Sequence, residues 1–482
     1  MAGSVQATPG FDLQPSSQQV PLATNYITNF NFLNQYLPDT YEKEFERYGN
    51  RTISSFLRLV GAELPSNSDL VKWAEQGRLH TKYSSVGTAA SAAADSATFQ
   101  VNDTGVPAFS GSNGIALRPG QTVVIVQNGG TGVNKGIVTA VDVSNNQFTA
   151  AFYEAGGLVT AGTGVGNADV TVWIYGSEFK KGTVGMSGSL EADDVIFDNS
   201  PIIIKDKYSV SGSDMAQIGW IEVTTENGAT GYLWYLKSEH ETRLRFDDYL
   251  EVAMIEAVPA EANSGVVDAA ANPTFGNKGS DGIFYVVQNR GNVWGGGNPS
   301  TLTEFDSVIG RLDKQGAIEE NVIFLNREFS FDIDDMLAST NSYGANGTSY
   351  GLFDNDSEMA LNLGFTGFRR GYDFYKSDWK YLNDPTMRGG LPSGANSGTI
   401  NGLLVPAGST SVYDQILGKN AKRPFLHVRY RASETEDRKY KTWITGSAGG
   451  AMNSDLDAME VHFLSERCVC TMGANNFFIF ED

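Results

Sequence analysis

The stretch GYLWYLKSEHETRLRFDDYLEVAMIEA, residues 231–257, decides the fold, because it is a long helix candidate between two glycine-rich segments of β character. Apolar side chains in its second half recur at i, i+3, i+4, i+7, i+8 and i+11, which indicates a helix buried along one side. They belong to Phe246, Tyr249, Leu250, Ala253, Met254 and Ala257. We expect a chain built around this helix with appended elements, rather than a closed catalytic globule.

The first half of this helix is charged instead. Glu239 with Arg243, and Glu241 with Arg245, stand in the favourable i, i+4 order of acid before base. Such pairs stabilise a solvated helix by about a few tenths of a kcal/mol each. The sequence leaves equally open that these charges contact neighbouring subunits.

Composition narrows the class of protein. A chain of 482 residues suggests roughly two to four domains. Its formal net charge of −21 and pI of about 4.6 argue against a surface that grips nucleic acid through clustered Lys and Arg. Charged residues are only 19%, while glycine is abundant at 54, which favours β-structure with tight turns. We predict an α+β fold that leans towards β.

The sequence shows no targeting or membrane signal. Residues 1–25 lack a basic region followed by an apolar stretch, so we expect no secretory signal. Apolar runs are far shorter than the roughly 18 residues of a membrane-spanning helix, so we expect no membrane partner.

The two cysteines, Cys468 and Cys470, are spaced so that both lie on one face of a strand, which is not the pattern of a disulfide framework. A reducing cytoplasm fits this usage. Zinc would need two further ligands, and His462 is the one close candidate, so two buried thiols are the favoured interpretation.

The N-terminal part predicts an arm followed by short helices. Residues 1–24 are rich in Gln, Ser and Pro, which is typical of a mobile arm. Helical spacing of apolar residues predicts short amphipathic helices over 41–48 and 53–64, and a third over 69–76. An extended piece follows over 78–86.

Residues 98–175 form the clearest β module, because short apolar strands alternate with Gly and Asn turns. Strands are expected over 122–127, 136–143, 147–153 and 170–174, which predicts a small barrel or sandwich. The polar, glycine-punctuated segment that follows the module, residues 179–213, has few core residues and is not expected to be stable alone. Two extended arms around a compact insert predict a β-ribbon that is buried only when another molecule covers it.

The second half of the chain predicts a mixed domain. GIFYVVQN, residues 282–289, is typical of a strand, and a helix over 305–312 is expected to end near Gly316. A strand over 321–326 and a helix over 331–337 follow. Further strands are expected over 425–431, 441–445, 459–464, 467–471 and 476–480.

Catalytic and metal-binding patterns are weak. The histidines His80, His240, His427 and His462 are scattered without paired-ligand spacing, and no nucleophile motif appears. The glycine-rich segments 129–136 and 161–166 read as hairpin turns rather than phosphate loops. Acidic residues at 332–335 and 354–358 suit a helix start and an incomplete calcium loop. We predict no catalytic, cofactor or metal residues and no enzyme, although two distant carboxylates could still serve a hydrolase.

The order of these elements resembles the major capsid protein of tailed bacteriophages, the Hong Kong 97-like family. Residues 231–257 look like the family's spine helix, and 303–329 like the helix and strand of its axial domain. The segments 25–50 and 68–83 also resemble capsid proteins of crAss-like phages. The resemblance implies a division into an N-terminal arm with short helices (1–77), an E-loop ribbon (78–97 and 176–215) with an all-β insertion domain (98–175), a spine helix with peripheral domain (216–300), an axial domain (301–455) and C-terminal strands of the peripheral domain (456–482).

The function implied by this resemblance is a shell subunit that assembles into hexamers and pentamers around phage double-stranded DNA. Implied partners are further copies of the chain and portal, scaffold and decoration proteins; the implied location is the virion, assembled in the bacterial cytoplasm. Lys180, Lys181, Arg243 and Arg245 are the candidate assembly contacts. The alternative is a β-rich carbohydrate-binding virion or surface protein, such as a tail fibre or adhesin, because exposed tryptophans stack on sugars.

Overall fold

The structure, a computed structural model, describes residues 57, 62–88, 95–101, 115–128, 132–154, 170–189, 194–216, 223–224, 230–231, 234–262, 264–266, 277–316, 318–341, 367–391, 399–414, 419–450 and 452–482. The predicted arm, the helix over 41–48 and the acidic loop 354–358 lie outside these residues. The chain divides into two compact units. Among the described residues, one unit contains 207–243 and 444–461, and the other contains the remainder.

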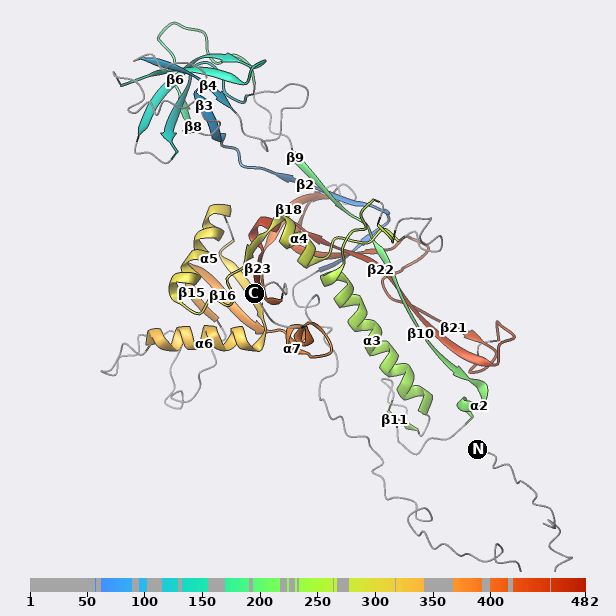
Figure 1. Ribbon diagram of the computed structural model, residues 1–482. Helices are drawn as coiled ribbons and strands as arrows, with labels where there is room; N and C mark the ends of the chain where they lie inside the picture. The colour runs from blue at the N-terminus through green and yellow to red at the C-terminus, as the bar shows by residue number, and fades with distance from the viewer. Residues whose placement is uncertain are drawn as a thin grey trace, which may run out of the picture. The chain divides into compact units, whose positions relative to one another are not determined.

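Six antiparallel strands close into a barrel in the order β3-β4-β7-β6-β5-β8 (Figure 1). Alternate side chains fill its interior, where the Phe99 and Phe148 rings stack 5.2 Å apart. The barrel extends beyond the predicted 98–175, because Tyr83 and Val86 are buried in its core. The strands are β3 (Lys82–Thr88), β4 (Ser96–Val101), β5 (Gln121–Gln127), β6 (Val133–Asp142), β7 (Gln147–Phe152) and β8 (Val170–Ser177).

Both chain connections to the barrel pass through a two-stranded antiparallel ribbon of β2 (Val71–Gln76) and β9 (Asp194–Asn199). The predicted helix over 69–76 is therefore wrong, and so is the placement of the first ribbon arm over 78–97, since β3 belongs to the barrel. The apolar residues of VKWAEQ, residues 71–76, fit both the period of a helix and that of a strand. Pairing with β9 selects the strand, because it buries Val71 and half-buries Trp73 while leaving Lys72 exposed.

A five-stranded sheet has the order β1-β20-β22-β10, with β21 also paired to β22. Strand β1 replaces the end of the helix predicted over 53–64, although Leu57 is helical. The two strands predicted at 459–464 and 467–471 are one strand. The polar residues between the two predicted strands are buried, and Ser465 Oγ donates to the Lys439 carbonyl over 2.6 Å. The strands are β1 (Ala62–Ser66), β10 (Ile202–Ser211), β20 (Leu426–Arg431), β21 (Lys441–Gly446) and β22 (Ala458–Thr471).

A six-stranded sheet has the order β13-β23-β17-β14-β16-β15. Its helix α5 (Leu302–Gln315) contains the helix predicted over 305–312 and ends at Gly316, as predicted. It begins with a capping box at Thr301 and Glu304, and Gly316 adopts the left-handed conformation. Strand β23 lies between β13 and β17, so the predicted C-terminal stretch 456–482 is divided between two sheets. The strands are β13 (Asn292–Trp294), β14 (Glu320–Leu325), β15 (Gly367–Arg370), β16 (Tyr372–Asp378), β17 (Ile400–Pro406) and β23 (Phe478–Glu481).

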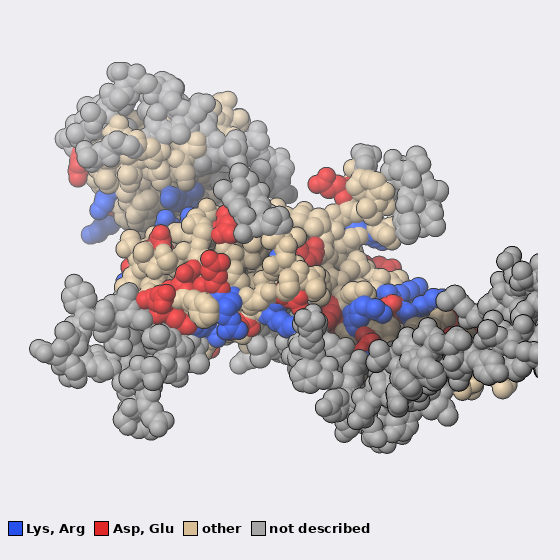
Figure 2. Space-filling view, turned by 60° about the horizontal axis from the view of Figure 1, so that its bottom comes forward, with Lys and Arg blue, Asp and Glu red and all other residues tan. Residues whose placement is uncertain are grey.

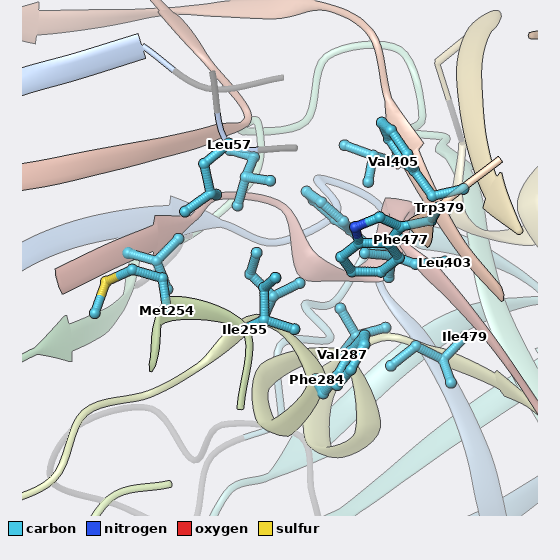
Figure 3. Packing of buried hydrophobic residues seen from close by; sticks show 14 of the residues in the cluster. Leu57, Met254, Ile255, Phe284, Val287, Trp379, Leu403, Val405, Phe477 and Ile479 are labelled. Carbon is cyan, nitrogen blue, oxygen red and sulfur yellow. The ribbon is translucent and has the colours of Figure 1, made fainter. Parts of the chain in front are cut away.

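The predicted long helix is confirmed as α3 (Trp234–Glu256). Phe246, Leu250 and Met254 of the expected stripe are buried, whereas Tyr249 is 45% exposed. The strand predicted over 282–289 is wrong, because these residues form α4 (Ile283–Arg290). Short apolar runs fit both structures, and here burial of Ile283, Phe284 and Val287 on one helix face decides. Figure 3 shows Phe284 and Val287 on this helix, within the core.

The remaining elements are short or peripheral. Helix α6 (Arg327–Asn341) contains the helix predicted over 331–337. The others are α2 (Gly212–Met215), β11 (Val223–Thr224), β12 (Thr230–Gly231), α7 (Lys380–Asn383), β18 (Ser409–Asp414), β19 (Lys419–Pro424) and two 3₁₀ turns, Arg388–Gly390 and Ala474–Asn476. Among the helices that are described, none combines the length and apolar character needed to cross a bilayer. Basic and acidic groups both lie on the face shown in Figure 2.

Candidate functional site

The two faces of the β2–β9 ribbon differ in their surroundings. Trp73 opposes Phe197 and Val71 opposes Asn199 on one face, which we call the anchored face. Ala74 opposes Ile196 on the other, which we call the open face. Side chains at successive strand positions point to opposite faces, so the alternation of buried and exposed residues along β2 separates the two.

Asn199 fixes the base of the ribbon, and its side chain is buried with every hydrogen-bonding position used. Its Nδ2 donates to the carbonyl oxygens of Asp281, over 3.0 Å, and Val469, over 2.6 Å. Its Oδ1 accepts from Ser280 Oγ and from the Asp281 amide, each over 2.9 Å. One side chain thus joins the end of β9 to the loop before α4 and to the C-terminal part of β22.

A cation–aromatic cluster covers the same face. The Arg290 guanidinium carbon lies 3.9 Å from the centre of the Phe197 ring and 6.0 Å from that of Trp73. Burial lowers the pKa of Arg290, while the charges of Glu75 and Asp281 oppose that shift. Glu75 accepts from Trp73 Nε1 over 2.9 Å and from the Gly473 amide over 3.0 Å. The anchored face is therefore held by aromatic, ionic and backbone contacts together.

Beneath the ribbon lie the two cysteines, as free thiols. Cys468 and Cys470 are 0% and 1% exposed and pack with Val71 and Trp73. The contact with Cys470, together with burial, raises the pKa of Cys468. The prediction of two buried thiols on one strand face is confirmed, and both pack against residues of the ribbon.

The open face carries an apolar side chain among charges. Ile196 is 65% exposed. Lys72 Nζ and Asp198 Oδ2 lie 4.0 Å apart across the two strands. Because a two-stranded sheet has unpaired edges and little core, such a face is a candidate for contact with another molecule.

A second apolar surface lies between the start of β10 and the C-terminal half of α3. It is an open groove of about 440 Å³, lined by Ile202, Ile204, Tyr249, Val252, Ala253, Glu256 and Ala257. Glu256 at this groove is clamped, since Arg388 donates to its two carboxylate oxygens over 2.5 and 2.9 Å and Tyr381 also donates to it. Burial, more than that hydrogen bond, raises the pKa of Tyr381.

The four predicted contact residues lie in two places, one pair in a turn and one pair on α3. Lys180 and Lys181 are exposed in a turn between β8 and β9, not on the ribbon strands. Arg243 is exposed on α3 and acts electrostatically on Glu239, as the i, i+4 spacing predicts. Arg245 Nε lies 3.5 Å from Asp206 Oδ2 within the same chain. Their role in contacts between subunits stays a prediction.

The residues that hold the ribbon were not predicted from the sequence. Asn199 follows an ordinary strand pattern, and Arg290 ends a segment that was expected to be a strand. The pairing of aromatics at positions 73 and 197 is the one available signal. Among the described residues, no group of three His, Cys, Asp or Glu side chains could hold a metal ion.

No protein-family model and no curated protein matches the chain. Among solved structures, it is similar to a chain from Microbacterium phage Oxtober96, with 9% identity, coverage of 93% of this chain and 96% of that chain, and a TM-score of 0.37. The cyanophage Pam1 capsid matches with 13% identity, coverage of 64% and 82%, and a TM-score of 0.35. The capsid of cyanophage P-SCSP1u matches with 9% identity, coverage of 79% and 96%, and a TM-score of 0.33. TM-scores below 0.5 do not establish a shared fold, so function has to be argued from this chain's own residues.

Proposed function

We propose that this chain is a major capsid protein, a structural rather than catalytic subunit that assembles with copies of itself into an icosahedral shell around double-stranded DNA. In this proposal β2 and β9 are the base of an E-loop, α3 is the spine helix, and the barrel is an insertion in the loop. Hexamers and pentamers, portal, scaffold and decoration partners, and assembly in the bacterial cytoplasm belong to the same proposal.

The observation that carries the proposal is the contrast between the ribbon's two faces. Asn199 and Arg290 hold the anchored face within the chain, while Ile196 on the open face remains 65% exposed. Because the anchored face is fixed to the same chain, the open face is exposed in the same way in every copy of the protein. Such a surface suits a head-to-tail contact, which closes rings when the rotation between copies allows it.

The energy of one such contact is modest. Full burial of an isoleucine side chain contributes about 1.5–3 kcal/mol. Since Ile196 is 65% exposed, its coverage by a neighbour would contribute about 1–2 kcal/mol. One contact of this size does not hold two subunits, but a closed shell repeats it at every subunit, so its loss should be visible in assembly.

The acidic composition is compatible with a container for DNA. A net charge of −21 gives the chain the same sign as the phosphate backbone. Like charge opposes adsorption of the packaged nucleic acid to the protein. The proposal therefore assigns DNA no sequence-specific binding site on this chain.

The proposal is tested with Ile196→Lys in the full chain, expressed alone and with its neighbouring genes, using negative-stain microscopy and light scattering. We expect the wild type to form closed shells or capsomer-sized rings and Ile196→Lys to remain as small, folded species. Ile196→Val, which keeps an apolar side chain, is the matched control and should assemble. A wild type that is a monodisperse monomer or trimer under every condition would overturn the shell function, and normal shells from Ile196→Lys would overturn the role of the open face.

A further inference from the structure

The outside of the barrel carries exposed aromatic side chains that are not part of its hydrophobic core. Trp173 and Tyr175 on β8 are 43% and 46% exposed, and Tyr153, after β7, is 49% exposed. The barrel core is filled by other residues, among them Phe99 and Phe148. Large apolar rings left in water on a closed barrel, which has no sheet edge to protect, indicate a binding surface.

These rings are neighbours and form one surface with two charged groups. The Trp173 and Tyr175 ring centres lie 6.2 Å apart, with their planes inclined at 67°. Lys135 Nζ lies 6.0 Å from the centre of the Tyr175 ring. The Tyr153 hydroxyl donates to the Glu178 carboxylate, and the Tyr153 amide donates to the Lys135 carbonyl over 3.0 Å. We call Trp173, Tyr175, Tyr153, Lys135 and Glu178 the aromatic platform.

The platform stands on a rigid support. In the barrel, Trp173 is paired with Lys82 of β3 on one side and Val124 of β5 on the other. Lys135 is paired with the same Val124 from the far side of β5. Pairing on both sides fixes the position of the Trp173 backbone. Sites on paired strands hold their geometry better than sites on loops.

The chemistry of the platform selects one kind of ligand. Aromatic faces and hydrogen-bonding charges alternate within a few ångströms, which matches a pyranose with its apolar C–H face and its rim of hydroxyls. A protein partner needs about 800 Å² per side with an apolar centre, whereas charged groups interrupt this surface. A single-stranded nucleic acid binds in a basic groove. Here the acidic Glu178 lies on the same surface as Lys135, so the surface is mixed in charge.

We propose that the aromatic platform of the barrel is a carbohydrate-binding site. This inference goes beyond the shell function and does not depend on it. A sugar ring stacks on Trp173 or Tyr175, while Lys135 donates hydrogen bonds to its hydroxyls and Glu178 accepts them. Because a shell would display many copies of the barrel, weak binding at each site would add up to firm attachment.

The test displays the purified full chain in many copies on fluorescent beads and applies them to an array of bacterial and mammalian glycans. Wild type should bind at least one glycan class. The double variant Trp173→Ala, Tyr175→Ala should weaken that binding about tenfold or more, in line with the loss of ring stacking. Trp443→Ala removes a tryptophan of similar exposure, 37%, from strand β21, and is the matched control. It should bind like the wild type.

As a control for folding, the midpoint of thermal unfolding is measured for each variant. Because the substituted side chains are exposed, we expect midpoints close to that of the wild type. The proposal is overturned if the wild type binds no glycan on the array, or if the double variant binds as well as the wild type. Equal loss of binding in Trp443→Ala also overturns it, because the effect would not belong to the platform. Self-association that disappears in the double variant, without any glycan binding, would assign the surface to a second copy of the chain instead.

Discussion

Replacing Asn199 by alanine should release the base of the ribbon while leaving the rest of the chain folded. The change removes four hydrogen bonds to other segments, two donated by Nδ2 and two accepted by Oδ1, besides one that Oδ1 accepts from the adjacent Ser200 amide. A net value of about 1 kcal/mol for each gives a loss of roughly 3–4 kcal/mol, because the site is buried and the remaining groups find no ready partner. This loss should fall on local opening of the ribbon, where all four bonds converge.

The buried thiols provide the assay. Cys468 and Cys470 lie under Val71 and Trp73, so a thiol reagent reaches them only when the ribbon lifts. If opening and closing are fast relative to labelling, the labelling rate follows the population of the open form. A loss of 3–4 kcal/mol then raises the rate of reaction with a chromogenic disulfide reagent by roughly a few hundredfold.

Two comparisons make the result specific. Asn145→Ala removes an exposed asparagine from a barrel turn, where it donates to Asp142, and should leave the labelling rate unchanged. Denaturant unfolding followed by circular dichroism should show that Asn199→Ala labels at concentrations well below its global transition. A labelling rate for Asn199→Ala within threefold of the wild-type rate would refute the inference that this side chain holds the ribbon.

Two further predictions concern the six-stranded sheet and its helices. Backbone amides of Ser300 and Thr301 lower the pKa of Glu304 below its ordinary 4.5, so the capping box stabilises the protein above that pH and is lost as pH falls through the lowered value. Glu304→Gln should therefore flatten the acid limb of the stability curve measured by thermal unfolding; an unchanged acid limb would contradict this. Lys376 Nζ lies 2.5 Å from Asp334, with both side chains about nine-tenths buried, so Lys376→Met should cost about 3–5 kcal/mol in denaturant unfolding. Adding Asp334→Leu should recover most of that loss, and no recovery would show that the cost is not the unpaired charge.

In the elements that could be predicted from the sequence, the repeat of apolar residues fits either a helix or a strand, but not both. The apolar stripes of α3 and α5 extend over several turns, and the strands of the barrel are bounded by turn residues. In such segments local preference and tertiary packing agree. The prediction therefore needed no knowledge of which other segment each one contacts.

The elements that were mispredicted are short and fit two periods. VKWAEQ of β2 and IFYVVQNR of α4 each allow a helix or a strand, and a distant partner decides between them. Pairing with β9 makes the first a strand, while burial against Met254 and Ile255 makes the second a helix. No local signal carries information about a partner that lies outside the segment.

The candidate site was harder to predict than the fold for the same reason. Charged residues such as Arg245 attract attention in a sequence, yet this side chain lies near Asp206 of its own chain. Asn199, which fixes the ribbon, is one of many polar residues at strand ends. Its importance comes from three segments that meet around it, namely β9, the loop at 280–281 and β22.

The position of Asn199 also explains how one ribbon can serve two purposes. The partners of the Asn199 amide in other segments lie at 280–281 and in β22, not on β2, so the amide fixes which face of β9 is turned inward. Side chains at successive strand positions point to opposite faces, so Phe197 shares the face of Asn199 and lies over Arg290, while Ile196 points the other way and is exposed. In the proposed shell, the buried amide therefore determines which apolar side chain faces a neighbouring copy, and Asn199→Ala should weaken assembly even though Asn199 itself is buried away from any such contact.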